Sequence, residues 1–79
     1  MSPTIFKMGS LRFYFFSREE RRLHVHVQGT RGEAKFWIEP RIELAADYGL
    51  GARMTARALQ LIREHENEIR TAWRAHFGR

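Results

Sequence analysis

The apolar residues of this chain repeat with two different periods. Up to Ile38, apolar and polar side chains mostly alternate, which is typical of β-strands with one buried face. Over residues 52–77 the apolar residues recur every three or four positions, as in a helix that lies on a sheet. The pattern predicts an α+β fold, a small antiparallel β-sheet of about three to five strands with one long C-terminal helix packed on one face. A chain of 79 residues forms a single domain, here mainly strands over residues 1–46 and helix over 52–77.

Turn-forming residues divide the alternating half into separate strands. Gly9 and Ser10 indicate one tight turn, and the segment 29–32, which begins and ends with glycine, indicates a β-hairpin. Pro40 cannot donate a backbone hydrogen bond and ends the strand before it. We therefore expect strands at residues 4–7, 11–16, 23–28 and 33–38, and a short edge strand at 42–44.

The hairpin predicts its own strand register. If Thr30 and Arg31 form the turn, Val25 lies opposite Phe36, and the other apolar residues of the two strands also meet apolar partners. A slip by one residue would invert both faces, so this register is favoured. On the opposite face the same register pairs His24 with Trp37 and His26 with Lys35.

The register of the preceding strand depends on the length of the next loop. A loop of about five residues, at 17–21, is compatible with a hairpin between the second and third strands. That loop length pairs Phe13 with Val25, Tyr14 with His24 and Arg12 with His26.

One sheet face is expected to lie under the helix and the other to be uncovered. In each strand every second residue is apolar and faces the apolar stripe of the helix, whereas the residues between them are polar or aromatic. The covered face consists of Leu11, Phe13, Phe15, Leu23, Val25, Val27, Ala34, Phe36 and Ile38, and the helix stripe of Ala58, Leu59, Ile62, Ile69, Ala72, Trp73 and Phe77. The uncovered face carries two rows, Tyr14 with His24 and Trp37, and Arg12 with His26 and Lys35.

Composition narrows the class of protein. Lys and Arg number 14 against 9 Asp and Glu, a formal charge of +5, and most of these cations are arginine. Guanidinium binds phosphate bidentately and stacks on flat rings, which favours an anionic or aromatic partner, although the same charge suits an ordinary soluble domain. With no cysteine the chain has no disulfide and no thiol nucleophile. It has neither a signal-peptide core nor the roughly 18 consecutive apolar residues of a membrane helix, so we expect a soluble cytoplasmic protein.

The uncovered face indicates nucleic-acid chemistry. Arg12, His26 and Lys35 repel one another unless the histidine stays neutral or an anion such as phosphate binds beside it. Tyr14 and Trp37 offer stacking surfaces of the kind that single-stranded nucleic acids use. We therefore interpret Arg12, Tyr14, Lys35 and Trp37 as candidate nucleic-acid-binding residues.

His24 and His26 are the candidate catalytic residues. In a metal-independent ribonuclease either imidazole serves as general base, and Arg12 or Lys35 stabilises the phosphorane-like transition state. A polar strand face without turnover explains the same spacing, so the sequence leaves open whether the protein is an enzyme. No cofactor is expected.

Two other functions fit the same residues. The two strand histidines project to one side, as ligands of a metal-dependent enzyme do, but zinc requires further ligands, and His65 and His76 lie on the helix. We therefore assign no metal ligand. Alternatively, exposed Tyr14, Phe16 and Trp37 suit a non-catalytic protein interface or a homodimer surface.

Four segments of the chain carry a resemblance to a bacterial family. They are PTIFKMGSLRFYFFS, the HVHV pair, GEAKFWIEP and the final helix LIREHENEIRTAWRAHF. In this order and spacing they resemble, over nearly the whole chain, the family described as domain of unknown function 4160. One departure is that Arg22 and Leu23 stand where the family tends to carry prolines before its histidine pair.

The resemblance implies a partner and a set of functional residues. Members of the family are similar to small proteins encoded beside a second short protein, an arrangement that looks like a toxin-antitoxin pair. It implies a cognate small protein encoded nearby, and a functional role for His24 and His26 with Glu33, Lys35 and Trp37 as neighbours. We therefore expect a bacterial toxin-antitoxin-like component that acts on nucleic acid, with RNA favoured, and is controlled by its partner protein.

Overall fold

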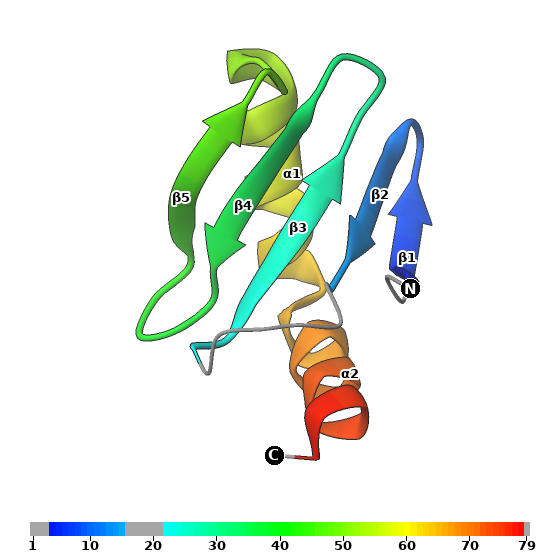
Figure 1. Cartoon of the computed structure of the whole chain (residues 1–79), viewed down its shortest axis with the longest axis vertical. Helices are drawn as coiled ribbons and strands as arrows, with labels where there is room; N and C mark the ends of the chain where they lie inside the picture. The colour runs from blue at the N-terminus through cyan, green and yellow to red at the C-terminus, as the bar shows by residue number, and fades with distance from the viewer. Residues whose placement is uncertain (1–3, 16–21, 79) are drawn as a thin grey trace.

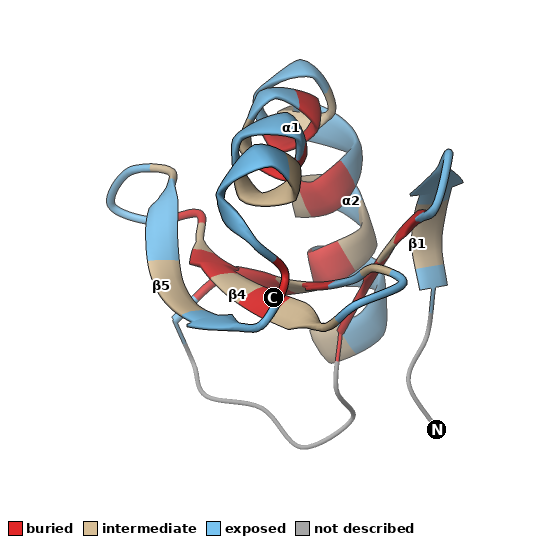
Figure 2. Cartoon of the chain, turned by 90° about the horizontal axis from the view of Figure 1, so that it is seen from above, coloured by how far each residue is buried: buried red, intermediate tan, exposed pale blue. Residues whose placement is uncertain are grey.

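The protein consists of one five-stranded antiparallel sheet with two helices on one of its faces (Figure 1, Figure 2). The structure is a computed structural model that describes residues 4–15 and 22–78, so the predictions for Phe16 and the loop 17–21 lie outside the described residues. Neither helix in the described ranges is both long and apolar enough to cross a membrane. The α+β class and the antiparallel sheet are confirmed. The strands lie in the sheet in the order in which they occur along the chain, β1 Thr4–Met8, β2 Leu11–Tyr14, β3 His24–Gln28, β4 Glu33–Trp37 and β5 Glu43–Tyr48. The helices that follow are α1 Ala52–Glu64 and α2 Glu66–Phe77.

The core lies between the sheet and the helices. Each residue of the sheet that was expected on the covered face is buried, and Phe13, Val25 and Phe36 have no exposed surface at all. Burying such a side chain contributes about 1.5–3 kcal/mol, so this layer supplies the main stabilisation of the fold. From the helices, the buried residues are Ala58, Leu61, Ile62, Ile69 and Trp73, with Leu59, Ala72 and Phe77 partly buried beside them.

The β3–β4 hairpin has the register that the sequence predicted. Val25 lies opposite Phe36, and the amide of Gly29 donates to the carbonyl of Gly32 at 2.9 Å to close the turn. The short turn and the strict alternation agree on one pairing, which is why the sequence was sufficient here. The polar pairs His24 with Trp37 and His26 with Lys35 are also as predicted.

The β2–β3 register differs from the prediction by two residues. A shift by two keeps every side chain on its own face, so the hydrophobic pattern accepts both registers equally. The choice depends on the length of the connection between the strands, which the alternation does not determine. The observed pairs are Arg12 with Gln28, Phe13 with Val27 and Tyr14 with His26, and the predicted pairs of Phe13 with Val25, Tyr14 with His24 and Arg12 with His26 are wrong.

The single long helix that the sequence predicted is two helices. α1 ends at Glu64, and His65 leaves the helical conformation, with φ −114° and ψ 22°. The Nδ1 atom of His65 donates to the carbonyl of Leu61 at 2.9 Å, and the same carbonyl accepts the backbone amide of His65 at 3.0 Å. The imidazole stacks on Phe6 of β1 with ring centroids 4.5 Å apart. No proline or glycine marks the position, and the apolar period alone continues through it.

The last strand is longer than the sequence predicted. β5 spans six residues instead of the short segment 42–44, and its register against β4 shifts next to Ala45. Leu44 lies opposite Phe36 and Ala46 opposite Lys35, so the residue between them is a bulge. The bulge breaks the period of two after Leu44, and this is the residue at which the predicted strand ended.

Gly32 allows the hairpin turn to pack against the end of β5. A Cβ at this position would lie 2.5 Å from the carbonyl oxygen of Tyr48 and 2.6 Å from the carbonyl carbon of Gly49. Both atoms belong to the backbone and cannot rotate away. A Cβ on Gly29 would instead meet a side-chain methyl group of Leu50 at 2.7 Å, which a rotamer change relieves.

We predict that Gly32→Ala lowers the free energy of unfolding by about 1–3 kcal/mol, the usual cost of overpacking. The matched variant Gly29→Ala should cost less, because only a flexible side chain has to move. Urea denaturation of both variants and of the unchanged protein measures the two losses. Equal losses, or none in Gly32→Ala, would contradict the close backbone approach.

Candidate nucleic-acid interface

Four rings form a row across β2, β3 and β4. Tyr14 stacks on His26 with ring centroids 5.5 Å apart and an interplanar angle of 27°. His26 meets His24 edge-on at 5.2 Å, and His24 meets Trp37 edge-on at 5.7 Å. On each of these neighbouring strands the rings occupy positions that alternate with the buried apolar residues, so the period of two places them on one face. We call Tyr14, His26, His24 and Trp37 the ring row.

Positive groups lie over both ends of the ring row. The Cζ atom of Arg12 is 4.5 Å from the ring centroid of Tyr14. Over Trp37, the Cζ atom of Arg22 lies 3.9 Å and the Nζ atom of Lys35 4.5 Å from the ring centroid. At these distances a cation is attracted to the negative face of the ring. All six residues that the sequence singled out therefore belong to one cluster, with Arg22 as an addition.

Two members of the ring row are less exposed than the sequence predicted. Tyr14 is 3% exposed and His24 has no exposed surface, so the expectation that both lie on an uncovered face is wrong. His24 begins β3 at the end of the sheet past which α2 extends, and its ring meets Trp73 of that helix edge-on at 5.4 Å (Figure 1). Its Nδ1 donates to the carbonyl of Arg22 at 2.7 Å. The His24 ring is therefore held by both layers.

The remaining members of the cluster keep part of their surface exposed. Arg12, His26, Lys35 and Trp37 are each half-buried, and Lys35 lies directly opposite His26 on β4. An imidazole beside an ammonium group is a suitable pair for phosphate chemistry, because one group transfers protons and the other stabilises negative charge. The Nε2 atom of His26 is buried, so proton transfer through that atom requires a local opening.

Tyr14 is a fixed hydrogen-bond donor. Its hydroxyl donates to Oε1 of Glu33 at 3.1 Å. Burial raises the pKa of Tyr14 to about 12, the hydrogen bond to Glu33 and the charge of that carboxylate act in the same direction, and Arg12 opposes them. The phenol therefore remains neutral over the physiological pH range and orients the end of the ring row.

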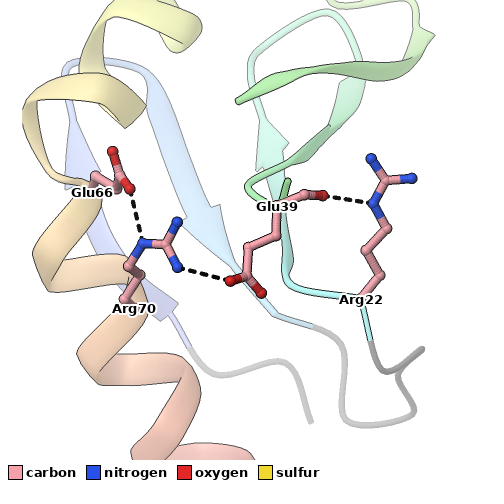
Figure 3. Close-up of polar contacts among 4 residues, drawn as sticks. All are labelled: Arg22, Glu39, Glu66 and Arg70. Carbon is pink, nitrogen blue, oxygen red and sulfur yellow. Dashed lines mark hydrogen bonds and ion pairs between the residues drawn. The ribbon is translucent and has the colours of Figure 1, made fainter. Parts of the chain in front are cut away.

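Arg22 connects the site to the rest of the fold (Figure 3). Its Nε donates to the backbone carbonyl of Glu39 at 2.7 Å, and its Nη2 lies 3.5 Å from the carboxylate of Glu43. The Glu39 side chain meets Nη1 of Arg70 on α2 at 3.2 Å, and Nε of Arg70 meets Glu66 at 2.8 Å. One acidic residue after β4 thus joins the ring-row cation to α2.

The register of the β3–β4 hairpin also indicates, from the sequence alone, that Arg22 lies near Trp37. When the predicted hairpin register is continued by one further pair on the same face, Arg22 falls opposite Glu39 and diagonal to Trp37. Diagonal neighbours on one face are within reach of long side chains.

The histidines of the helices do not join the histidine pair of β3. His65 stacks on Phe6, and His76 lies beside Phe15 with ring centroids 6.2 Å apart. In the described ranges 4–15 and 22–78, no group of three His, Asp or Glu side chains is arranged to hold a metal ion.

The fold and the cluster define a small α+β domain with an aromatic, cation-flanked sheet face. The family model described as Domain of unknown function (DUF4160) matches residues 10–74 of the 79-residue chain. The chain belongs to this family, as its four sequence segments indicated. No curated protein and no solved structure matches the chain.

We predict that the Tyr14 phenol ionises at about pH 12, above the ordinary value of 10.0. Between these two pH values the unfolded chain loses the proton while the folded chain keeps it. Since the raised pKa belongs to the folded state, its stabilisation is complete below pH 10 and is lost as the pH rises toward 12. Absorbance at the tyrosinate band and denaturation at each pH measure the two effects.

The variant Tyr14→Phe is the control for this titration, because Tyr48 is the other tyrosine and stays in place. The absorbance difference between the two proteins isolates Tyr14. A difference step centred near pH 10 would show that neither burial nor Glu33 acts on the phenol.

Proposed function

We propose that this chain is a bacterial toxin-antitoxin-like component that acts on nucleic acid, with RNA favoured, and is controlled by a partner protein. The observation that carries the proposal is the ring row with positive groups over both of its ends. Single-stranded RNA exposes flat bases and regularly spaced phosphates. A surface that alternates rings with cations fits both of these features.

Trp37 is the ring best placed to receive a base. It is half-buried, whereas Tyr14 and His24 are enclosed and support the row from within. A base that stacks on the indole displaces Arg22 or Lys35 from the ring face. The displaced cation then pairs with the neighbouring phosphate, so one cluster binds both parts of a nucleotide.

His26 is the favoured general base if the protein cleaves RNA. It accepts the proton of the ribose 2′-hydroxyl as that oxygen attacks phosphorus, and Lys35 or Arg12 stabilises the charge of the transition state. The bond from phosphorus to the 5′-oxygen breaks, a cyclic 2′,3′-phosphate forms, and the leaving 5′-oxygen takes a proton from water. His24 packs edge-on against His26 and acts with it. This role requires the enclosed Nε2 of His26 to open toward the substrate.

A second candidate function is a non-catalytic protein-protein interaction module. Tyr48 is 66% and Leu44 44% exposed on the edge strand β5, and apolar side chains on a free sheet edge favour a protein partner. In the main proposal the same edge is a natural surface for the controlling partner.

We predict that the protein binds single-stranded RNA with an affinity that falls steeply as salt increases. Lys35→Ala should weaken binding and reduce the slope of log affinity against log salt by about 0.7, the value for one phosphate contact on a single strand. Arg63→Ala on the outer surface of α1 removes the same charge and serves as the control. Fluorescence anisotropy of a labelled RNA over a salt series gives both quantities, and salt-insensitive association would favour the interaction module instead.

We also predict that expression of the chain without its neighbouring gene inhibits bacterial growth and that co-expression relieves the inhibition. His26→Ala should abolish the inhibition without lowering the melting temperature, whereas His76→Ala on α2 should leave it intact. Growth curves are measured for four strains, which express the unchanged chain alone, the chain with its neighbouring gene, His26→Ala and His76→Ala. A fully active His26→Ala protein would exclude this histidine as the general base.

A further inference from the structure

Most glycines of the chain gather at one end of the molecule. The β1–β2 turn, the β3–β4 turn and the β5–α1 connection lie at the same end of the sheet (Figure 1). Glycine leaves the backbone amides at such turns accessible to a ligand. Five of the six glycines lie in these connections, namely Gly9, Gly29, Gly32, Gly49 and Gly51.

Two adjoining open cavities lie at this end. The first, of about 270 Å³, lies between the β1–β2 and β3–β4 turns and is lined by Lys7, Ser10 and Gln28 among others. The second, of about 410 Å³, lies between the β3–β4 turn and the start of α1 and is lined by Arg31 and Arg53 among others. Thr30 lines both cavities, so they form one continuous surface, which we call the turn-end surface.

The cations of the turn-end surface are not neutralised by the described part of the chain. Lys7, Arg31 and Arg53 are exposed, and within residues 4–15 and 22–78 none of them forms an ion pair. The nearby carboxylates are engaged elsewhere, since Glu33 accepts the Tyr14 hydroxyl and Asp47 accepts the amide of Leu50 at 2.8 Å. A concave surface that carries several such cations and no compensating anion attracts negatively charged ligands.

We propose that the turn-end surface binds phosphate groups of the RNA backbone. This inference rests on the proposed function and extends its binding site beyond the ring row. Lys and Arg side chains, hydroxyl groups, amide side chains and backbone amides are the groups that contact phosphates in nucleic-acid complexes. The turn-end surface offers each of these kinds in Lys7, Ser10, Gln28, Thr30, Arg31 and Arg53.

Arg12 makes the turn-end surface continuous with the ring row. Its guanidinium lies over Tyr14, and its Nη1 donates to Oε1 of Gln28 at 3.2 Å inside the first cavity. Residues 24–30 span about 20 Å at the rise of an extended strand. A single strand that stacks a base on Trp37 therefore reaches Thr30 within a few nucleotides. An acidic peptide offers no bases for the rings, so RNA fits the whole surface better.

The test uses the full chain and compares two double variants, each of which removes two exposed arginines that form no ion pair among the described residues. Arg31→Ala/Arg53→Ala changes the turn-end surface, and Arg63→Ala/Arg74→Ala is the control on the outer faces of α1 and α2. The probe is a labelled single-stranded RNA of about twelve nucleotides, within the range of site sizes for such proteins. We expect the first variant to lose about tenfold in affinity and about 1.4 in salt slope, and the control to lose clearly less.

The outcomes separate this inference from the proposed function. If the unchanged protein binds RNA and both double variants bind equally well, the turn-end inference is overturned and the proposed function stands. If the unchanged protein does not bind RNA, both the turn-end inference and the proposed function are overturned. If a poly-glutamate peptide of equal charge competes as effectively as unlabelled RNA, the turn-end surface recognises acidic proteins and the inference is overturned. Thermal melting of both variants checks that they remain folded.

Discussion

Burial of one sheet face beneath two helices is the constraint on which the rest of this structure depends. A chain of this size gains little margin from its core, so every second side chain of the central strands must be apolar and enclosed. Val25 and Phe36, opposite each other on β3 and β4, have no exposed surface. Because side chains alternate along a strand, this requirement sends the residues between them to the other face. The ring row is a consequence of how the core is built.

The same architecture explains why the ring row is well ordered and only partly accessible. α2 extends past the end of the sheet, where Trp73 meets His24, and Glu39 links the start of β3 to α2 through Arg22 and Arg70. Enclosed rings lose little freedom when a ligand binds, so the half-buried Trp37 is presented on a rigid support. The cost is that proton transfer by the β3 histidines depends on local movement.

Charge is distributed over the molecule in a way that favours one kind of ligand. Cations lie over both ends of the ring row. Further cations, Lys7, Arg31 and Arg53, lie at the glycine-rich turns of the same sheet and form no ion pair within the part of the chain that the structure describes. Arg12, whose guanidinium lies over Tyr14, also lines the first of the two cavities there. Under the proposed function, a flexible polyanion with flat side groups contacts all of these features at once, whereas a compact anion would contact only one of them. This continuity is the physical basis for treating the sheet face and the turns as one binding surface.

The sequence by itself determined which residues of the strands face the helices, the register of the β3–β4 hairpin and the pairing of His26 with Lys35, because a two-residue turn and strict alternation allow one solution. Burial of Leu50 and Leu61 was not predicted. Tertiary structure decided the rest. A shift of two residues preserves both faces, so only the full connection selects Tyr14 as the neighbour of His26. The helical period of the sequence continues through His65, where the backbone leaves the helical conformation between α1 and α2. Burial of His24 depends on its contact with Trp73, a helix residue far along the chain. The alternation within a strand carries no information about such contacts between the sheet and the helices.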